Sequence, residues 1–273
     1  MIPLGDSSNP SLLPAAQIDV FSGDPNFMTS LARGLAVIQA FSHAKSFLTI
    51  SQLSVTTGLS RAAVRRCLYT LTKLGLAMSE DGRHFSLRPR ILTLGHSYIS
   101  SLPVAKLAQP ILDRLSQTLR ESCSIAMLDG SDVIHVAHSN VTRILAIDLS
   151  MGSRLPAINT SLGRVMLASL SPEDLEAHLG RADLVAHTAR TIVSMADMRH
   201  AIQFVRTNGY ALVDQELEIG LRALAVPIRN SAGKVIAALN VGAHAQRVSV
   251  QDMVGTFLPH LQSAAEEISS LLK

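Results

Sequence analysis

Apolar and polar positions along residues 48–87 follow helical spacing twice and then strand spacing twice. Thr49 stands three residues before Gln52, the arrangement of a capping box, in which the hydroxyl accepts from a free amide and the glutamine reaches back. The helix that opens there is expected to end at Gly58, because glycine adopts the left-handed conformation of a helix C-terminus. Ser60 then caps a second helix. The pattern predicts two short helices joined by a tight turn, which is a helix-turn-helix.

The second helix, over residues 61–74, divides into two faces at 100° per residue. Its apolar face consists of Val64, Cys67, Leu68 and Leu71. Its polar face consists of Ala62, Arg65, Arg66, Tyr69 and Lys73, with Arg61 at the edge. A helix that reads DNA needs such a face, since arginine can bind guanine and Arg, Lys and Tyr can hold phosphates. The alternative is an ordinary amphipathic helix with a solvated basic side.

A hairpin is expected directly after this helix, because Asp81-Gly82 lies between the short alternating runs 76–79 and 84–87. A hairpin in this place is the wing of a winged helix, although a plain surface hairpin fits the same pattern. Arg83 and His84 lie near its tip and could reach the DNA backbone or minor groove. The candidate DNA-binding residues are therefore Thr49, Ser51, Gln52, Ser60, Arg61, Ala62, Arg65, Arg66, Tyr69, Lys73, Arg83 and His84.

The charge is concentrated in the same region. Residues 27–90 hold nine Lys and Arg against two acidic residues, whereas the whole chain has a net charge of only +3. A basic module beside a nearly neutral one is the pattern expected of a protein that binds nucleic-acid phosphates.

Helical spacing also predicts a supporting helix before the helix-turn-helix, with Leu31, Leu35, Ile38 and Phe41 on its packing face and a cap at Thr29 or Ser30. The predicted domains are a flexible tail over 1–26, a winged DNA-binding domain over 27–88, a linker helix over 89–102 that could pair with its copy in a dimer, and an effector-binding and oligomerisation domain over 103–273.

The last of these domains alternates strands and helices. Strands are expected at 124–128, 133–137, 144–149, 210–213, 223–228 and 234–241, and helices at 160–170, from Pro172, at 196–207 and at 251–272. Pro110 should break or kink the helix from Pro103 to about Arg120, or start a new one. The fold class is α+β, with an antiparallel sheet flanked by helices.

Several classes of protein are excluded by what the sequence lacks. It has no apolar run of 18 residues, no secretory leader pattern, no nucleophile elbow, no phosphate loop and no paired metal-binding motif. His135 and His138 stand three apart on a predicted strand and should point to opposite faces, so they are not expected to bind a metal. Cys67 and Cys123 are far apart, and Cys67 is expected to be a buried thiol. The expectation is a cytoplasmic protein without enzymatic activity, metal or cofactor.

The chain resembles the IclR family of bacterial transcription regulators over nearly its full length, and within that family the PcaR group, which controls the β-ketoadipate route of aromatic acid catabolism. The resemblance rests on residues 27–41, 61–67, 92–96, 213–222 and 237–241, of which the string Asp214-Gln-Glu-Leu-Glu218 and the string Ala238-Leu-Asn240 are specific. It implies a GAF-like effector domain, a homodimer or homotetramer, double-stranded operator DNA as partner with RNA polymerase as a further one, and a small carboxylate effector such as β-ketoadipate, protocatechuate or 4-hydroxybenzoate.

Carried over from the family, the effector site would consist of Leu155, Pro156, Ala157, Asn159, Thr160, Ser161, Gly163, Asp214, Glu216, Ala223, Leu224 and Asn240. Free amides at the start of the helix over 160–170 suit a carboxylate, and Arg154, Arg164 or Arg222 could add a cation. The two acidic residues do not suit an anion, so they either orient a hydroxyl or keto group or simply hold a loop. The alternative to a sensor is a constitutive DNA-binding protein whose C-terminal domain serves only oligomerisation.

Overall fold

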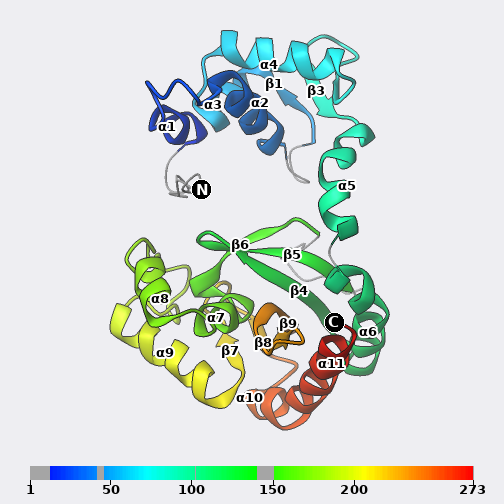
Figure 1. Cartoon of the computed structure of the whole chain (residues 1–273), viewed down its shortest axis with the longest axis vertical. Coiled ribbons are helices and arrows are strands. Elements are labelled where there is room, and N and C mark those ends of the chain that lie inside the picture. The colour runs from blue at the N-terminus through cyan, green and yellow to red at the C-terminus, as the bar shows by residue number, and fades with distance from the viewer. Residues whose placement is uncertain (1–12, 42–45, 102, 140–150, 273) are drawn as a thin grey trace. The chain divides into compact units, whose positions relative to one another are not determined.

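The chain forms two compact units in the computed structural model, one up to Tyr98 and one from Ile99 (Figure 1). The structure describes residues 13–41, 46–101, 103–139 and 151–272. The expected strand at 144–149 lies outside these residues.

The N-terminal unit is a winged helix. In the described part its elements are α1 (Pro14–Asp19), α2 (Thr29–Gln39), β1 (Leu48–Thr49), α3 (Ile50–Thr57), α4 (Arg61–Lys73), β2 (Ala77–Met78) and β3 (His84–Leu87). The strands form an antiparallel sheet in the order β1-β3-β2, so the predicted hairpin is present and also pairs with the strand before α3.

The local signals of the helix-turn-helix are confirmed. The Thr49 hydroxyl accepts from the amide of Gln52 at 3.2 Å, and Gln52 Oε1 accepts from the amide of Thr49 at 2.8 Å. Gly58 ends α3 in the left-handed conformation with φ of 74°, and the Ser60 hydroxyl accepts from the amide of Ala63. Side chains of α2, α3 and α4, among them Val37, Leu53 and Leu68, make the core.

The prediction for the packing face of α2 was right for Ile38 and Phe41, which pack against the core, and wrong for Leu31 and Leu35. Leu31 and Leu35 are 57% and 47% exposed, whereas Ala36 and Val37 are buried. The helix follows Met28 without a side-chain cap, so neither Thr29 nor Ser30 caps it. The sequence offers apolar residues on more than one side of this helix, and packing against α4 selects the side that contains Val37.

The prediction of a flexible tail over 1–26 was wrong for the part that the structure describes, because residues 14–19 form α1. Ile18 is buried, and the position of a Cβ on Gly58 would lie only 3.1 Å from the Cβ of Ala15. The rings of Phe21 and Phe27 stack with their centroids 4.6 Å apart. Apolar contacts with the helix-turn-helix therefore order a segment whose prolines and serines indicate mobility.

Two helices follow the wing. A 3-10 turn (Pro89–Ile91) leads into α5 (Leu92–Ser101), and α6 runs over Pro103–Leu119. Pro110 lies inside α6 and does not start a new helix, which corrects the prediction of a break. Ala108, Ile111 and Leu112 are buried on α6, and their packing offsets the backbone hydrogen bond that proline removes.

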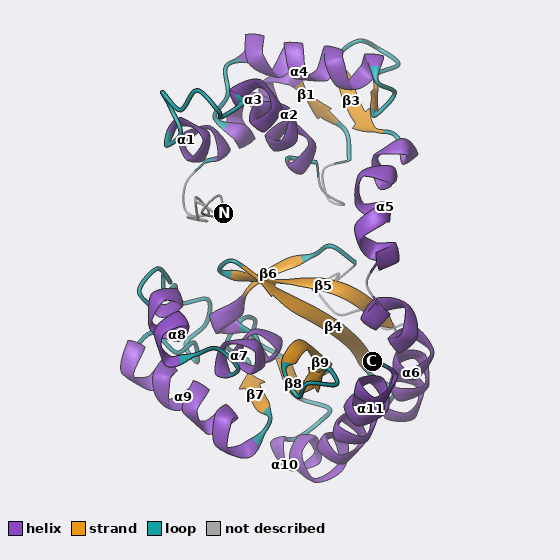
Figure 2. Cartoon of the chain, viewed as in Figure 1, coloured by secondary structure: helices purple, strands orange, loops and turns teal. Residues whose placement is uncertain are grey.

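The C-terminal unit contains an antiparallel sheet whose described strands run in the order β6-β5-β4-β9-β8-β7 (Figure 2). These strands are β4 (Ser122–Asp129), β5 (Asp132–Ser139), β6 (Arg154–Pro156), β7 (Ala211–Asp214), β8 (Leu221–Arg229) and β9 (Val235–His244). The helices are α7 (Ser161–Ala168), α8 (Pro172–Leu179), α9 (Met195–Asn208), α10 (Val250–Asp252), a π-helical segment (Met253–Phe257) and α11 (Leu258–Leu271). The α+β prediction is confirmed.

Each face of this sheet has its own core. Larger residues such as Ile125, Leu224 and Leu239 pack with α6 and α11, whereas Ala126 and Ala238 pack with α7, α8 and α9. Because strand residues alternate between faces, neighbours in sequence enter different cores. The face toward α7 is lined by small residues along its central strands, and this face carries the candidate effector site.

Candidate functional site

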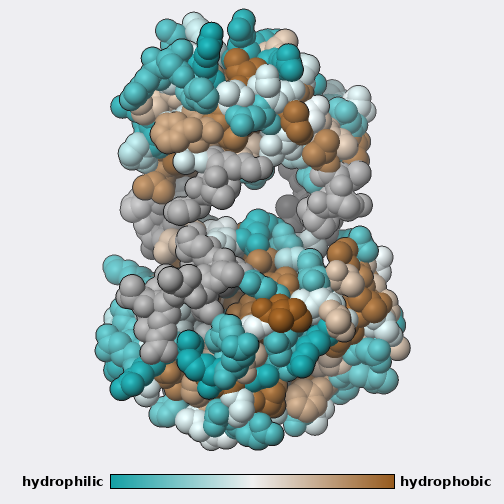
Figure 3. Space-filling model, turned by 180° about the vertical axis from the view of Figure 1, so that it is seen from behind, coloured by the Kyte–Doolittle hydropathy of each residue, from teal (hydrophilic) through white to brown (hydrophobic). Residues whose placement is uncertain are grey.

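The polar face of α4 is exposed as predicted. Arg61, Arg65, Arg66 and Lys73 are exposed while Val64, Leu68 and Leu71 are buried against the other helices. Ala62 and Tyr69 are exposed too, and the Lys73 ammonium lies 5.4 Å from the centroid of the Tyr69 ring. Within the described residues none of the three arginines forms an ion pair, so their charges remain available to a phosphate or base. The edge of the unit where α4 lies is mostly hydrophilic (Figure 3). Cys67 on the inner face is half-buried rather than buried as expected, and this partial burial raises the pKa of its thiol.

The other predicted DNA contacts divide into two groups. Thr49, Gln52 and Ser60 have their side chains in helix caps. Ser51 and Arg83 are exposed, and their side chains have no hydrogen-bond or ion-pair partner among the described residues. In the wing, His84 Nδ1 lies 2.6 Å from Asp81 Oδ2. This contact, with two backbone amides, holds the pKa of Asp81 well below its usual range. His84 therefore helps to fix the wing turn, which leaves Arg83 as the freer cation at its tip.

The effector candidates in the segment 155–163 lead from β6 into α7. Leu155 and Pro156 are half-buried on β6, and Ala157 is buried. The Thr160 hydroxyl caps α7 by accepting from the amide of Gly163 at 3.0 Å. Asn159 Nδ2 and Ser161 Oγ are buried without a hydrogen-bond partner.

Two more unpaired groups lie on the sheet. Asn240 Oδ1 on β9 and both ring nitrogens of His135 on β5 are buried without a hydrogen-bond partner. Asn240 is opposite Ser124 and His135 is opposite Ala126, and both partners belong to β4, two residues apart. Directly opposite residues point to one side of a sheet, as do residues two apart, so His135 and Asn240 share the face toward α7.

The prediction that His135 and His138 point to opposite faces was wrong. The pairing of β4 with β5 shifts between Ile125 and Ala126, so that Val136 is an extra residue and the alternation changes phase. Val136 and Ala137 both enter the core with α6 and α11, which leaves both histidines on the other face. Sequence reasoning missed His135 as a site residue because the bulge has no turn residue to mark it.

His135 is uncharged at neutral pH. Burial lowers its pKa to about 4, with a smaller contribution from the neighbouring His138. A neutral imidazole offers one donor and one acceptor nitrogen. His138 Nδ1 lies 2.7 Å from the Ser124 hydroxyl, so this second histidine has a partner. No group of three metal-binding side chains occurs among the described residues.

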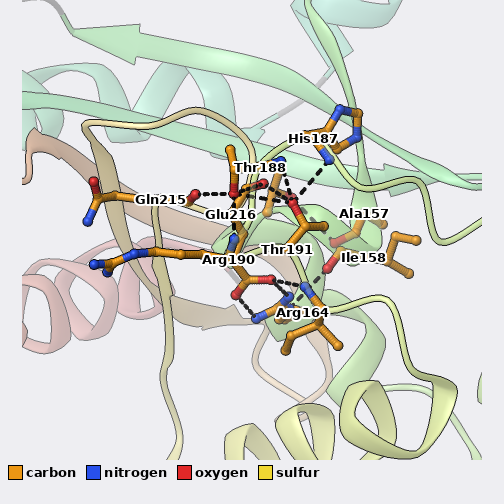
Figure 4. A network of polar contacts seen from close by, with 11 residues as sticks. Ala157, Ile158, Arg164, His187, Thr188, Arg190, Thr191, Gln215 and Glu216 are labelled. Carbon is orange, nitrogen blue, oxygen red and sulfur yellow. Dashed lines mark hydrogen bonds and ion pairs between the residues drawn. The ribbon is translucent and has the colours of Figure 1, made fainter.

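The acidic candidates are held by arginines. Glu216 is buried and forms a bidentate ion pair with Arg164, with nitrogen–oxygen distances of 2.6 and 2.7 Å (Figure 4). Asp214 lies 2.7 Å from both Arg190 and Arg222. Of the two roles expected for these acids, orienting the effector or holding a loop, the ion pairs favour the second. The carboxylates already pair with the guanidinium groups of Arg164 and Arg222.

The remaining candidates differ in where they point. Ala223 shares the face of Asn240, since it is opposite Gly242, two residues further along β9. Leu224 is its neighbour and enters the core with α6 and α11. Arg154 is bound to Asp129 and Asp132 at the edge of the sheet. The structure thus places Ala223, Asn240 and His135 on the sheet face that packs with α7, and Asn159 and Ser161 where the chain enters α7. Leu224 lies on the other face.

Comparison with known proteins identifies both units. The model of the IclR helix-turn-helix domain matches residues 30–80, and that of the bacterial transcriptional regulator IclR C-terminal domain matches residues 96–270. The chain is 53% identical to the Pca regulon regulatory protein of Pseudomonas putida, over 93% of this chain and 88% of that protein. It is 35% identical to the p-hydroxybenzoate hydroxylase transcriptional activator of Acinetobacter baylyi, over 90% and 93% of the two chains.

A solved structure agrees with the C-terminal unit. It is a double mutant of the PobR inducer-binding domain from Acinetobacter in complex with 3-hydroxybenzoic acid, 33% identical, with a TM-score of 0.59 over 62% of this chain and 98% of that chain. The chain belongs to the IclR family of bacterial transcriptional regulators.

Proposed function

We propose that this chain is a DNA-binding regulator of genes for aromatic-acid catabolism and that a small carboxylic acid binds its C-terminal unit. The observation that carries the proposal is the set of buried, unpaired polar groups of Asn159, Ser161, His135 and Asn240, which belong to the start of α7 and to the sheet face it covers. A buried polar atom without a partner costs free energy, so such a set indicates a ligand. The relatives named for the Pca regulon and for p-hydroxybenzoate hydroxylase support an acid of this route.

The proposed assembly is a homodimer or homotetramer in the cytoplasm. Each dimer would present two α4 helices to a palindromic or repeated operator. Effector binding would then shift the population of arrangements of the two readers through the linker over 89–102, by binding one arrangement more tightly than the other.

A direct test is a thermal-unfolding screen of the full chain with β-ketoadipate, protocatechuate, 4-hydroxybenzoate and cis,cis-muconate. An acid present at a hundred times its Kd should stabilise the protein by about 2.7 kcal/mol. If none of the four changes Tm at concentrations well above a micromolar Kd, the effector assignment is wrong. That result would favour the alternative of a constitutive DNA-binding protein whose C-terminal unit only oligomerises.

The two kinds of DNA contact on α4 should respond differently to substitution. If Arg65 reads a base, Arg65→Ala should weaken operator binding by about 1–3 kcal/mol and relax the preference at one base pair. Lys73→Ala should weaken binding to every sequence alike and lower the slope of the salt dependence by about one, because it removes a phosphate contact. Titrations of operator and scrambled DNA at several salt concentrations measure both effects. A uniform loss in both variants would remove Arg65 from the base-reading role.

A further inference from the structure

His135 is the one unpaired polar group of the site that does not lie on the α7 segment or in the sequence strings shared with the family. It is 1% exposed, and neither of its ring nitrogens has a hydrogen-bond partner. An imidazole that served only to fill space would leave two polar atoms desolvated, which apolar side chains of similar shape avoid. The position therefore calls for a partner that the described residues do not supply.

The spacing of the strands sets the distance between His135 and Asn240. β4 lies between β5 and β9, so the backbones that carry His135 and Asn240 are roughly 10 Å apart, twice the spacing of neighbouring strands. Between them on the same face stand Ser124 and Ala126, both small. That span suits a six-membered ring or a chain of similar length lying across β4.

The side chains of His135 and Asn240 offer different hydrogen-bonding groups from those at the start of α7. The entry to α7 offers the buried Ser161 hydroxyl and the buried Asn159 side-chain amide, and these groups suit the carboxylate end of a ligand. His135 and Asn240 are both uncharged, and each can donate and accept a hydrogen bond. Uncharged groups of this kind can satisfy a hydroxyl or a keto oxygen of a ligand.

We propose that His135, together with Asn240 on the other side of β4, recognises an uncharged oxygen of the effector and so determines which carboxylic acids the protein binds. The oxygen is either a hydroxyl on a ring or a keto group on a chain. This inference rests on the proposed function, since it says which residues recognise one end of the same ligand.

The test compares matched acids that differ only by that oxygen. Calorimetric Kd values are measured on the full chain for 4-hydroxybenzoate against benzoate and for β-ketoadipate against adipate. In one of the two pairs the wild-type protein should bind the acid that carries the oxygen at least about tenfold more tightly than the acid without it. Without that oxygen the buried groups of His135 and Asn240 stay unpaired. The pair that shows the preference distinguishes a hydroxyl from a keto oxygen.

His135→Phe should abolish this preference. It keeps a planar ring of similar size, so the two acids of the pair should then bind within about threefold of each other, with the unsubstituted acid bound nearly as in the wild type. His135→Gln, which restores a donor and an acceptor, should recover part of the preference. The matched control is His200→Phe, the same substitution at an exposed position of α9, and it should leave both Kd values unchanged. Asn240→Ala should reduce the preference in the same direction and provides the measurement if His135→Phe does not fold.

The results that would contradict the role of His135 differ from those that would contradict the proposed function. If the wild type binds acids but does not distinguish the members of either pair, or if His135→Phe keeps the preference, His135 does not read the oxygen and the proposed function still stands. If the wild type binds none of the four acids, the effector class itself is wrong and this inference fails with it.

Discussion

Glu216→Ala is expected to lower the free energy of unfolding by about 3–5 kcal/mol, one of the two largest effects of any single change considered in this protein. The side chains of Glu216 and Arg164 are 9% and 3% exposed, and two hydrogen bonds of 2.7 and 2.6 Å join them. Glu216 Oε2 also accepts from the amide of Ile192. Removing the carboxylate leaves a guanidinium buried without its counter-ion, which costs far more than the pair contributes when intact.

Urea denaturation of the variant measures this loss, and two further variants show whether burial is the cause. Glu176→Ala is the matched control, because Glu176 forms the same bidentate contact with Arg199 on the exposed surface and should change stability little. The double variant Arg164→Met with Glu216→Leu should recover most of the lost stability, since it removes both charges together. Equal losses at Glu216 and Glu176 would contradict this account of the ion pair.

The ion pair matters for the site because it joins two loops to α7. Thr188 Oγ1 donates to the carbonyl of Gln215, and Thr191 Oγ1 donates to the carbonyl of Glu216. Gln215 has φ of 61°, a conformation that side chains other than glycine rarely adopt. The network therefore holds the 214–220 loop in a fixed shape against α7, which begins at Ser161 directly after the 3-10 turn that carries Asn159.

Gly163→Ala is expected to cost about 3 kcal/mol or more, or to prevent folding of the C-terminal unit. A Cβ at this position would lie 2.0 Å from the carbonyl oxygen and 2.3 Å from the Cα of Ala157. The obstacle is backbone, which cannot rotate away as a side chain could, so α7 would have to move away from the 3-10 turn Ala157–Asn159. The sequence assigned Gly163 to the effector site by resemblance, and the structure gives it a packing role.

The same substitution at Gly255 is the matched control. Gly255 lies in the π-helical segment of the same unit, and no atom lies within 4 Å of the place where its Cβ would stand. Thermal unfolding should therefore show a large drop in Tm for Gly163→Ala and almost none for Gly255→Ala. A Gly163→Ala protein with wild-type Tm would mean that α7 does not lie as close to Ala157 as described.

Local chemistry accounts for the parts of the fold that the sequence predicted well. The Thr49–Gln52 capping box, the left-handed Gly58 and the Ser60 cap each depend on residues within four positions of one another. The two faces of α4 follow from its own periodicity, and the Asp81-Gly82 turn fixes the hairpin. Among the described helices, none combines the length and the apolar character needed to cross a membrane.

The predictions from sequence were wrong where the structure depends on contacts between residues far apart along the chain. The helix α2 has more apolar residues than it can bury, and contact with α4 left Leu31 exposed rather than Val37. Residues 14–19 form a helix because they pack on the helix-turn-helix, although their composition alone favours a mobile chain. The bulge at Val136 reversed the side to which His138 was expected to point, because alternation holds only while the register is unbroken.

The sequence by itself determined the helix-turn-helix and its hairpin, the α+β class of the second unit and the family, because caps, turns and periodicity act over a few residues. Only the tertiary structure decided that Asp214 and Glu216 are held by arginines, that Gly163 is a packing residue and that His135 stands opposite Asn240 across β4. The physical reason is that a hydrogen bond or ion pair between elements depends on distance in space, and spacing along the chain does not specify which side chains meet there.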